Sequence, residues 1–105
     1  MSQGVKFAIQ TYEDTMFAAG DSPTTHNFSA DLSGNGRAKG DGYFACDGGG
    51  SVTVALSHNG TTFGDEMTIK NGEKMHFVGV RKLRVTHIGS DSSYRIAVQL
   101  SEEQG

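Results

Sequence analysis

With 105 residues, 35% of them hydrophobic, and a net charge of −3, the chain is long enough for one domain and too short for a second core. The acidic balance excludes a broad basic surface for nucleic acid or anionic membranes. No apolar run approaches the length of a transmembrane helix, and residues 1–12 lack the apolar segment of a secretory signal.

Short runs of alternating apolar and polar residues follow one another along the chain, and this period of two is typical of half-buried strands. Residues 13–22 break the pattern and fit either a loop or one helical turn that holds Met16 and Phe17. The apolar positions of the expected strands are, in chain order, Val5, Phe7 and Ile9; Phe28, Ala30 and Leu32; residues 42–46; Val52, Val54 and Leu56; Met67 and Ile69; Met75 and Phe77; Leu83, Val85 and His87; and Tyr94, Ile96, Val98 and Leu100.

The 15 glycines lie between these runs and indicate turns. Residues 33–42 predict a long turn. The pairs Asn59-Gly60 and Asn71-Gly72 predict tight hairpin turns, because both residue types tolerate positive φ. About eight strands separated by such turns predict an all-β fold, a β-sandwich or jelly roll. We expect a single domain over residues 1–105, with residues 1–4 and 101–105 as flexible tails.

The chain contains residue types that serve in catalytic and metal sites, but no known sequence motif brings them together. The residues 34–40 match neither the dinucleotide-binding nor the Walker pattern, and Asp41 and Asp47 are too few carboxylates for calcium. The one cysteine, Cys46, lies in an apolar run, so we expect a buried, inert free thiol in a protein made in a cytoplasm. We predict no catalytic residue and no cofactor, because no motif places Ser, His and Asp together and no phosphate loop is present. We predict no metal site, because no close pair occurs among the four histidines, His26, His58, His76 and His87.

Two groups of residues each have two interpretations, one as part of a binding surface and one without a binding role. The basic residues Arg81, Lys82, Arg84 and Arg95 form either a solvated strand face or a docking surface for an acidic partner. Sugar binding usually needs exposed aromatic rings, and the chain has no tryptophan. The candidate rings for a sugar are Tyr12, Phe17, Tyr43 and Phe63, most of which we expect in the core.

Two families share patterns with this chain. The stretch 52–64, a strand followed by Ser-His-Asn-Gly and an aromatic residue, is similar to a hairpin of galactose-binding-like jelly rolls of the discoidin type. The stretch 50–100 resembles small virion proteins of tailed bacteriophages more closely, through this hairpin, Asn71-Gly72-Glu73 and the run from Thr86 to Tyr94. The second resemblance implies a structural role on a capsid or tail and brings no catalytic residues.

We therefore expect a non-enzymatic phage virion structural protein, most simply a capsid decoration or cement protein that stabilises the head shell. A tail or head–tail accessory role remains open. The expected partners are the major capsid protein or other virion proteins and further copies of the chain, as a homo-oligomer such as a trimer, without nucleic acid or membrane. The expected location is the virion, after synthesis in the host cytoplasm. The alternative is a carbohydrate-binding β-sandwich module.

Overall fold

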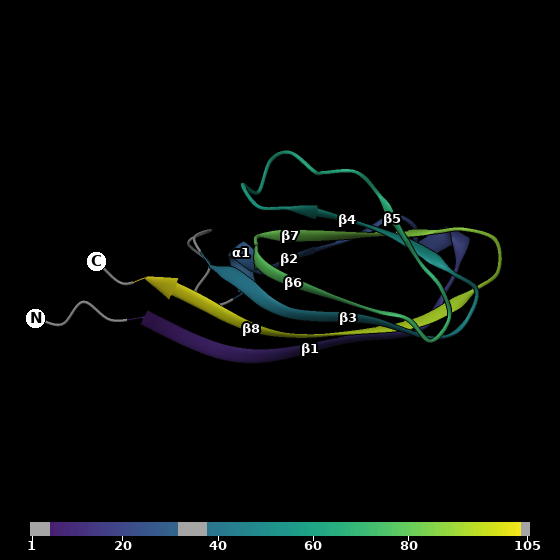
Figure 1. The fold of residues 1–105 in the computed structure, drawn as a ribbon, viewed down its shortest axis with the longest axis horizontal. Helices are drawn as coiled ribbons and strands as arrows, with labels where there is room; N and C mark the ends of the chain where they lie inside the picture. The colour runs from purple at the N-terminus through teal and green to yellow at the C-terminus, as the bar shows by residue number, and fades with distance from the viewer. Residues whose placement is uncertain (1–4, 32–37, 104–105) are drawn as a thin grey trace, which may run out of the picture.

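The computed structural model describes residues 5–31 and 38–103, and the side chains of residues 9–30 and 38–102. Figure 1 shows two β-sheets packed face to face as two layers. Sheet A has the strand order β1-β8-β3-β6 and sheet B the order β2-β7-β4-β5. The strands are β1 (Val5–Phe17), β2 (Thr24–Asn27), β3 (Lys39–Gly49), β4 (Val52–Ser57), β5 (Met67–Ile69), β6 (Lys74–Val80), β7 (Lys82–His87) and β8 (Ser92–Glu103), with short helical segments η1 (Ala19–Asp21) and α1 (Phe28–Asp31).

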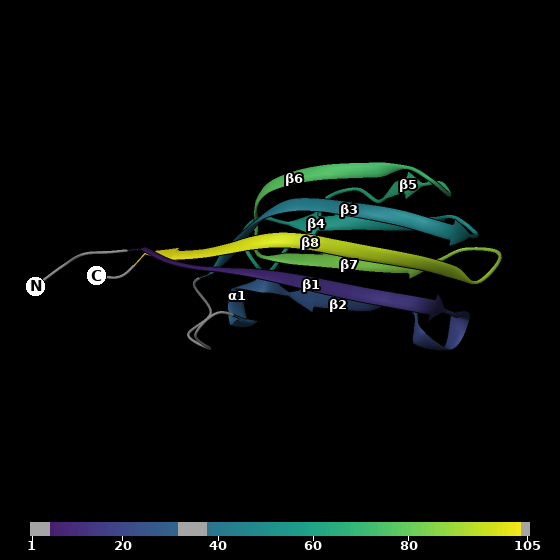
Figure 2. The ribbon, with the colours of Figure 1, turned by 90° about the horizontal axis from the view of Figure 1, so that it is seen from below.

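This strand order is that of a jelly roll, in which eight antiparallel strands form two sheets by way of two Greek keys. The chain crosses from one sheet to the other at nearly every connection, and only β4 and β5 are consecutive strands of one sheet. The prediction of an all-β sandwich or jelly roll of about eight strands is therefore confirmed. Figure 2 shows the four strands of sheet A side by side, with β6 and β1 at its two edges.

The core lies between the sheets and is rich in aromatic contacts. Tyr94 is at its centre, with its ring 5.1 Å from that of Phe44 and 5.3 Å from that of Phe17. Phe28 stacks against Phe77 at 5.8 Å. Such contacts add to the stabilisation that burial of apolar area provides. The alternating positions predicted for β4, β6, β7 and β8 contribute their apolar side chains to this core, so these strands are confirmed.

The N-terminal third differs from the prediction. Ile9 was expected on the buried face of its strand, but it is 80% exposed, because Tyr12, three residues on, faces inward and successive side chains of a strand alternate. Phe17 also faces inward, since a register shift between Asp14 and Phe17 changes the alternation. Residues 13–17 continue β1, so Phe17 is buried within a strand and Met16 is exposed. The strand expected at Phe28 and Ala30 is also wrong, because β2 ends at Asn27 and α1 follows it. Leu32, its third apolar position, lies outside the described residues.

The turns differ as well. Gly60 and Gly72 have positive φ as predicted, but neither pair forms a tight hairpin. Residues 58–66 form a long connection between β4 and β5, and Asn71-Gly72 lies where the chain passes from sheet B to sheet A. The turn predicted at 33–42 does not extend past residue 38, since β3 begins at Lys39, and residues 33–37 of the predicted turn lie outside the described part of the chain. Residues 101–103, expected as part of a tail, belong to β8 and pair with β1.

Glycine is required at two positions in β3. A Cβ atom on Gly42 would lie 2.0 Å from the carbonyl oxygen of Ala97 in β8. A Cβ atom on Gly40 would lie 2.5 Å from a methyl group of Val98 and 3.0 Å from the ring of Phe28. The contacts with Ala97 and Val98 are too short for a Cβ atom unless the neighbouring atoms shift, and the contact with Phe28 would be tight. The two glycines therefore let β3 and β8 approach closely and let Phe28 fill the end of the core.

Candidate functional site

The four histidines lie in separate environments. His26 Nε2 is hydrogen-bonded to the Tyr94 hydroxyl at 3.0 Å, inside the sandwich. His58 donates from Nδ1 to the carbonyl oxygen of Gly79 at 3.1 Å, and His87 Nε2 lies 3.2 Å from an Asp91 carboxylate oxygen. The His76 ring lies on sheet A, with its centre 6.2 Å from that of the Tyr43 ring. Throughout residues 5–31 and 38–103, no group of three or more His, Cys, Asp or Glu residues is arranged to hold a metal ion.

Cys46 is a core residue. Its side chain is 1% exposed, and its Sγ donates to the carbonyl oxygen of Gly50 at 3.4 Å. Burial is the largest influence on this thiol and raises its pKa above the ordinary value of 9.0; Asp47 and Glu73 add to the effect, while a backbone hydrogen bond at Gly48 opposes it. The thiolate is therefore disfavoured, and with it nucleophilic or redox chemistry at this position.

The four basic residues do not form one patch. Arg95 belongs to β8 in sheet A, where its Nε lies 2.9 Å from Asp47 Oδ2. Lys82 and Arg84 belong to β7 in sheet B. The guanidinium of Arg84 lies 4.5 Å from the centre of the Phe63 ring, which is a cation–π distance. The fold thus places Arg95 on sheet A, apart from Lys82 and Arg84 in sheet B and from Arg81, which directly precedes β7.

The outer face of sheet B is covered by the connection of residues 58–66. Glu66 Oε2 accepts hydrogen bonds from Thr53 and Thr86 at 3.2 and 3.1 Å, and Gly64 N donates to the carbonyl oxygen of Leu56 at 2.9 Å. Phe63 is held by Arg84, as described above. Beside this connection lies an open groove of about 660 Å³, lined by Leu56, His58, Asn59, Thr62, Phe63, Gly64, Asp65 and Met67.

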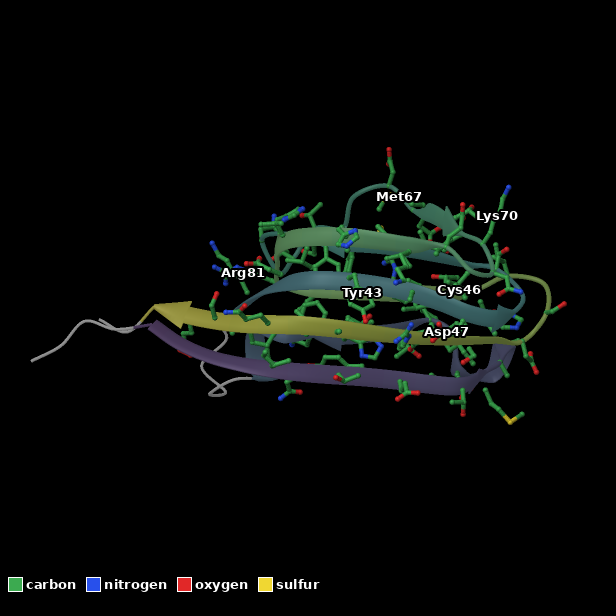
Figure 3. All side chains as sticks on the ribbon, turned by 60° about the horizontal axis from the view of Figure 1, so that its bottom comes forward. Tyr43, Cys46, Asp47, Met67, Lys70 and Arg81 are labelled. Atoms are coloured by element: carbon green, nitrogen blue, oxygen red, sulfur yellow. The ribbon has the colours of Figure 1, made fainter. Side chains whose placement is uncertain are left out.

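The outer face of sheet A carries a cluster around Tyr43, which Figure 3 shows on β3 together with Asp47. The amino group of Lys74 lies 5.5 Å from the centre of the Tyr43 ring, and the guanidinium of Arg95 lies 6.0 Å from it. Ala45 is cross-strand partner to both cations and is only 2% exposed, so their aliphatic stems shield it from water.

Two exposed apolar side chains on this face were not predicted. Ile9 in β1 is 80% exposed and Val78 in β6 is 74% exposed, the two highest values among large apolar residues in the described part of the chain. The sequence pattern predicted that Ile9 faces the core, whereas the structure shows that it faces solvent. At Val78 a signal exists in the sequence: Val78 follows the inward-facing Phe77, so it must face outward if β6 is a strand.

The four aromatic candidates for sugar binding are dispersed. Phe17 is fully buried, Tyr12 packs against the core, and Phe63 is stacked by Arg84. Tyr43 alone of the four lies on an uncovered sheet face. No described helix is long and apolar enough to cross a membrane.

No protein-family model matches the chain, and no curated protein sequence matches it significantly. Its fold is similar to that of a chain in a solved structure of Bacillus endospore appendages, described as a family of disulfide-linked pili. The TM-score is 0.70 and the sequence identity 14%, and the match covers 100% of this chain and 93% of that chain. The likeness is one of fold.

Proposed function

We propose that this protein is a non-enzymatic structural subunit, used in many copies within a larger protein assembly. The observation that carries the proposal is the whole-chain similarity to a chain from pilus-forming appendages, since the two share the jelly roll and nearly the same length. Two features of the chain support it. The histidines and Cys46 each serve packing or a local hydrogen bond, and the outer face of sheet A carries exposed apolar residues at its edges.

The more specific form of the proposal is a decoration or cement protein of a phage capsid. It is supported by the resemblance of residues 50–100 to small phage virion proteins and by the frequent use of jelly rolls in viral capsids. In this form the protein is made in the host cytoplasm, binds the major capsid protein, and is arranged as a small cyclic oligomer such as a trimer. A symmetric shell presents the same site many times, which compensates for weak individual contacts.

Any assembly of this chain is expected to be non-covalent. The appendages named above are disulfide-linked, whereas this chain has one cysteine. Cys46 is buried in β3 and bonded to Gly50, so a second copy does not reach its sulfur without opening the sandwich. A reducing agent should therefore leave the assembled mass unchanged, and its loss on reduction would contradict this part of the proposal.

The direct test is the state of the purified protein at rising concentration, alone and with capsids that lack a decoration protein. Regular particles or filaments of the protein alone support a self-assembling subunit. Binding to capsids at fixed stoichiometry, with a raised rupture temperature, supports the capsid form. A protein that stays monomeric at every concentration and binds no shell contradicts the structural proposal.

A carbohydrate-binding module is the second candidate, favoured by one observation. Tyr43 lies on an open sheet face, where a sugar ring would stack. Its ring is flanked by Lys74 and Arg95, so an acidic polysaccharide fits better than a neutral one. Retention of the wild type on an immobilised acidic polysaccharide, and passage of Tyr43→Ala through the same column, would favour this candidate.

A further inference from the structure

The four sheet edges differ in how much unpaired backbone they offer. In sheet B the edge strands are short, with β2 spanning Thr24–Asn27 and β5 spanning Met67–Ile69. In sheet A the edge strands are β1, with 13 residues, and β6, with 7 residues. Long edge strands with free N–H and C=O groups are templates for pairing with another chain unless they are blocked.

The edge of β6 is blocked only at one end. Gly79 has positive φ, its N–H donates to Asp41 Oδ1 at 2.7 Å, and its carbonyl oxygen accepts from His58. These contacts end the usable edge at Val78. In the strand order of the described residues, β6 has a neighbouring strand on one side only, which is β3, and β1 has a neighbouring strand on one side only, which is β8.

The strand directions allow these two edges to meet. Neighbouring strands of sheet A are antiparallel throughout the order β1-β8-β3-β6, so β6 is antiparallel to β1. A second copy shifted sideways in the plane of the sheet therefore places its β6 beside the first copy's β1 as an antiparallel pair. Figure 3 shows this face of sheet A, with β6 along one edge and β1 along the other.

The side chains on the outer face match across such a contact. One cross-strand row runs from Ile9 through Gln99 and Asp41 to the bulge at Val78, so a sideways shift brings Ile9 opposite Val78. A second row runs from Thr11 through Ala97 and Tyr43 to His76.

The third row, from Glu13 through Arg95 and Ala45 to Lys74, places an acid at the β1 edge and a base at the β6 edge. One register thus buries the two most exposed apolar side chains against each other and pairs opposite charges. A shift by two residues loses both matches, because it sets Ile9 opposite His76.

We infer that a second copy of this chain docks with residues 74–78 of its β6 against residues 9–13 of β1, extending sheet A from copy to copy. The inference rests on the proposed structural function and names its homotypic interface. The contact joins two different surfaces of the chain, so it generates a ring if the rotation between copies closes and a filament if it does not.

Cysteine cross-linking tests the register. In a Cys46→Ala background, Ile9→Cys combined with Val78→Cys should give a ladder of covalent dimers, trimers and larger species on a non-reducing gel. Within one copy the two positions lie three strand spacings apart, about 14 Å, too far for an internal disulfide. The matched control, Ile9→Cys with His76→Cys, is out of register by two residues, leaves the Glu13–Lys74 pair intact and should give no ladder.

Charge reversal tests the same contact without cysteines. Glu13→Lys and Lys74→Glu should each raise the concentration needed for assembly, on the order of three- to tenfold at low salt. The double variant restores the pair between copies and should assemble within about threefold of the wild type, which a merely local structural effect of either change would not produce.

The outcomes separate the two levels of the account. The inferred interface is wrong if the protein assembles but the Ile9/Val78 cysteine pair gives no ladder. It is also wrong if the out-of-register pair gives a ladder. Either result leaves the proposed function standing. A chain that stays monomeric in every variant, wild type included, overturns the inferred interface. If that chain also binds no capsid shell, the proposed function is overturned as well.

Discussion

At the scale of single residues, Tyr94 connects the two sheets. It lies in β8 of sheet A, is 1% exposed, and is hydrogen-bonded through its hydroxyl to His26 in β2 of sheet B. Burial is the main cause that raises the pKa of Tyr94 far above its ordinary value of 10.0, and the carboxylates of Asp14 and Asp21 add to the effect. The folded protein therefore keeps this hydroxyl protonated in a range where the unfolded chain ionises.

Alkaline stability should reveal this difference. The contribution of Tyr94 to the free energy of unfolding is fully present below about pH 10. Above the pKa of tyrosine in the unfolded chain, this contribution falls by roughly 1.4 kcal/mol per pH unit. Urea unfolding between pH 8 and pH 11.5 measures it.

Tyr94→Phe is the matched variant. It should cost about 0.5–1.5 kcal/mol of unfolding free energy at neutral pH through the lost hydrogen bond. Because only the wild type loses stability through this hydroxyl above about pH 10, the two curves should meet and then cross before pH 11.5. Curves that run parallel up to pH 11.5 would show that the hydroxyl titrates normally in the folded state.

Cys46 provides a second prediction at this scale. A hydroxyl can take over the bond to Gly50, so Cys46→Ser should lose less than about 1.5 kcal/mol of unfolding free energy. The native thiol should react with a small thiol reagent only as fast as the sandwich opens. Labelling within seconds in the native state, with no urea dependence, would contradict the buried position.

At the scale of elements, the pairing of β3 with β8 depends on glycine. Gly42→Ala places a methyl group against the backbone of Ala97 and should destabilise the fold by about 1–3 kcal/mol or more. Gly48→Ala, in the same strand, meets nothing within 4 Å. This control should be neutral, or stabilising by up to about 1 kcal/mol, because alanine has less freedom in the unfolded chain. Equal melting temperatures for the two variants would contradict the close approach of β3 and β8.

The connection over sheet B depends on one carboxylate. Glu66→Ala removes the acceptor shared by Thr53 and Thr86, so amides of residues 60–66 should exchange faster while the global unfolding free energy changes by only about 0.5–1.5 kcal/mol. Asp65→Ala is the matched control, because Asp65 makes no hydrogen bond to another described residue. Identical exchange in the two variants would show that Glu66 does not hold the connection.

The sequence predicted the strands of the second half well and those of the first half poorly. In β4, β6, β7 and β8 the apolar positions alternate cleanly, and such strands pack one face against the core. In β5, Ile69 is buried but Met67 is exposed. In β1 the apolar Ile9 faces solvent while Tyr12 and Phe17 face inward. Hydrophobicity alone therefore predicts the wrong set of core-facing side chains in this strand. The Asn-Gly pairs show positive φ but not which strands they join, because pairing depends on distant neighbours.

The candidate interface was not predictable in the same way. Ile9 and Val78 are far apart in sequence, and only the strand order brings them to opposite edges of one sheet in one row. The basic residues that looked like one patch are divided between two sheets for the same reason. Local patterns thus identified the fold class, whereas the surface that matters for assembly follows from topology.

At the scale of the whole molecule, the faces of the sandwich are unequal. The outer face of sheet B is covered by the chain's own connection, and the edges of sheet B are short. Sheet A keeps an uncovered outer face and two long edges whose apolar and charged side chains match. A repeated subunit needs two surfaces that fit each other, and sheet A provides them.

Hydrogen–deuterium exchange at dilute and concentrated protein tests this account most directly, because it reports backbone pairing residue by residue. On assembly, the outward-pointing amides of residues 9–13 and 74–78 should slow by on the order of tenfold or more. The amides of β2 and β5 should exchange as in the dilute sample. Exchange at β1 and β6 that is the same at every concentration, while larger species are present, would contradict the extension of sheet A from copy to copy.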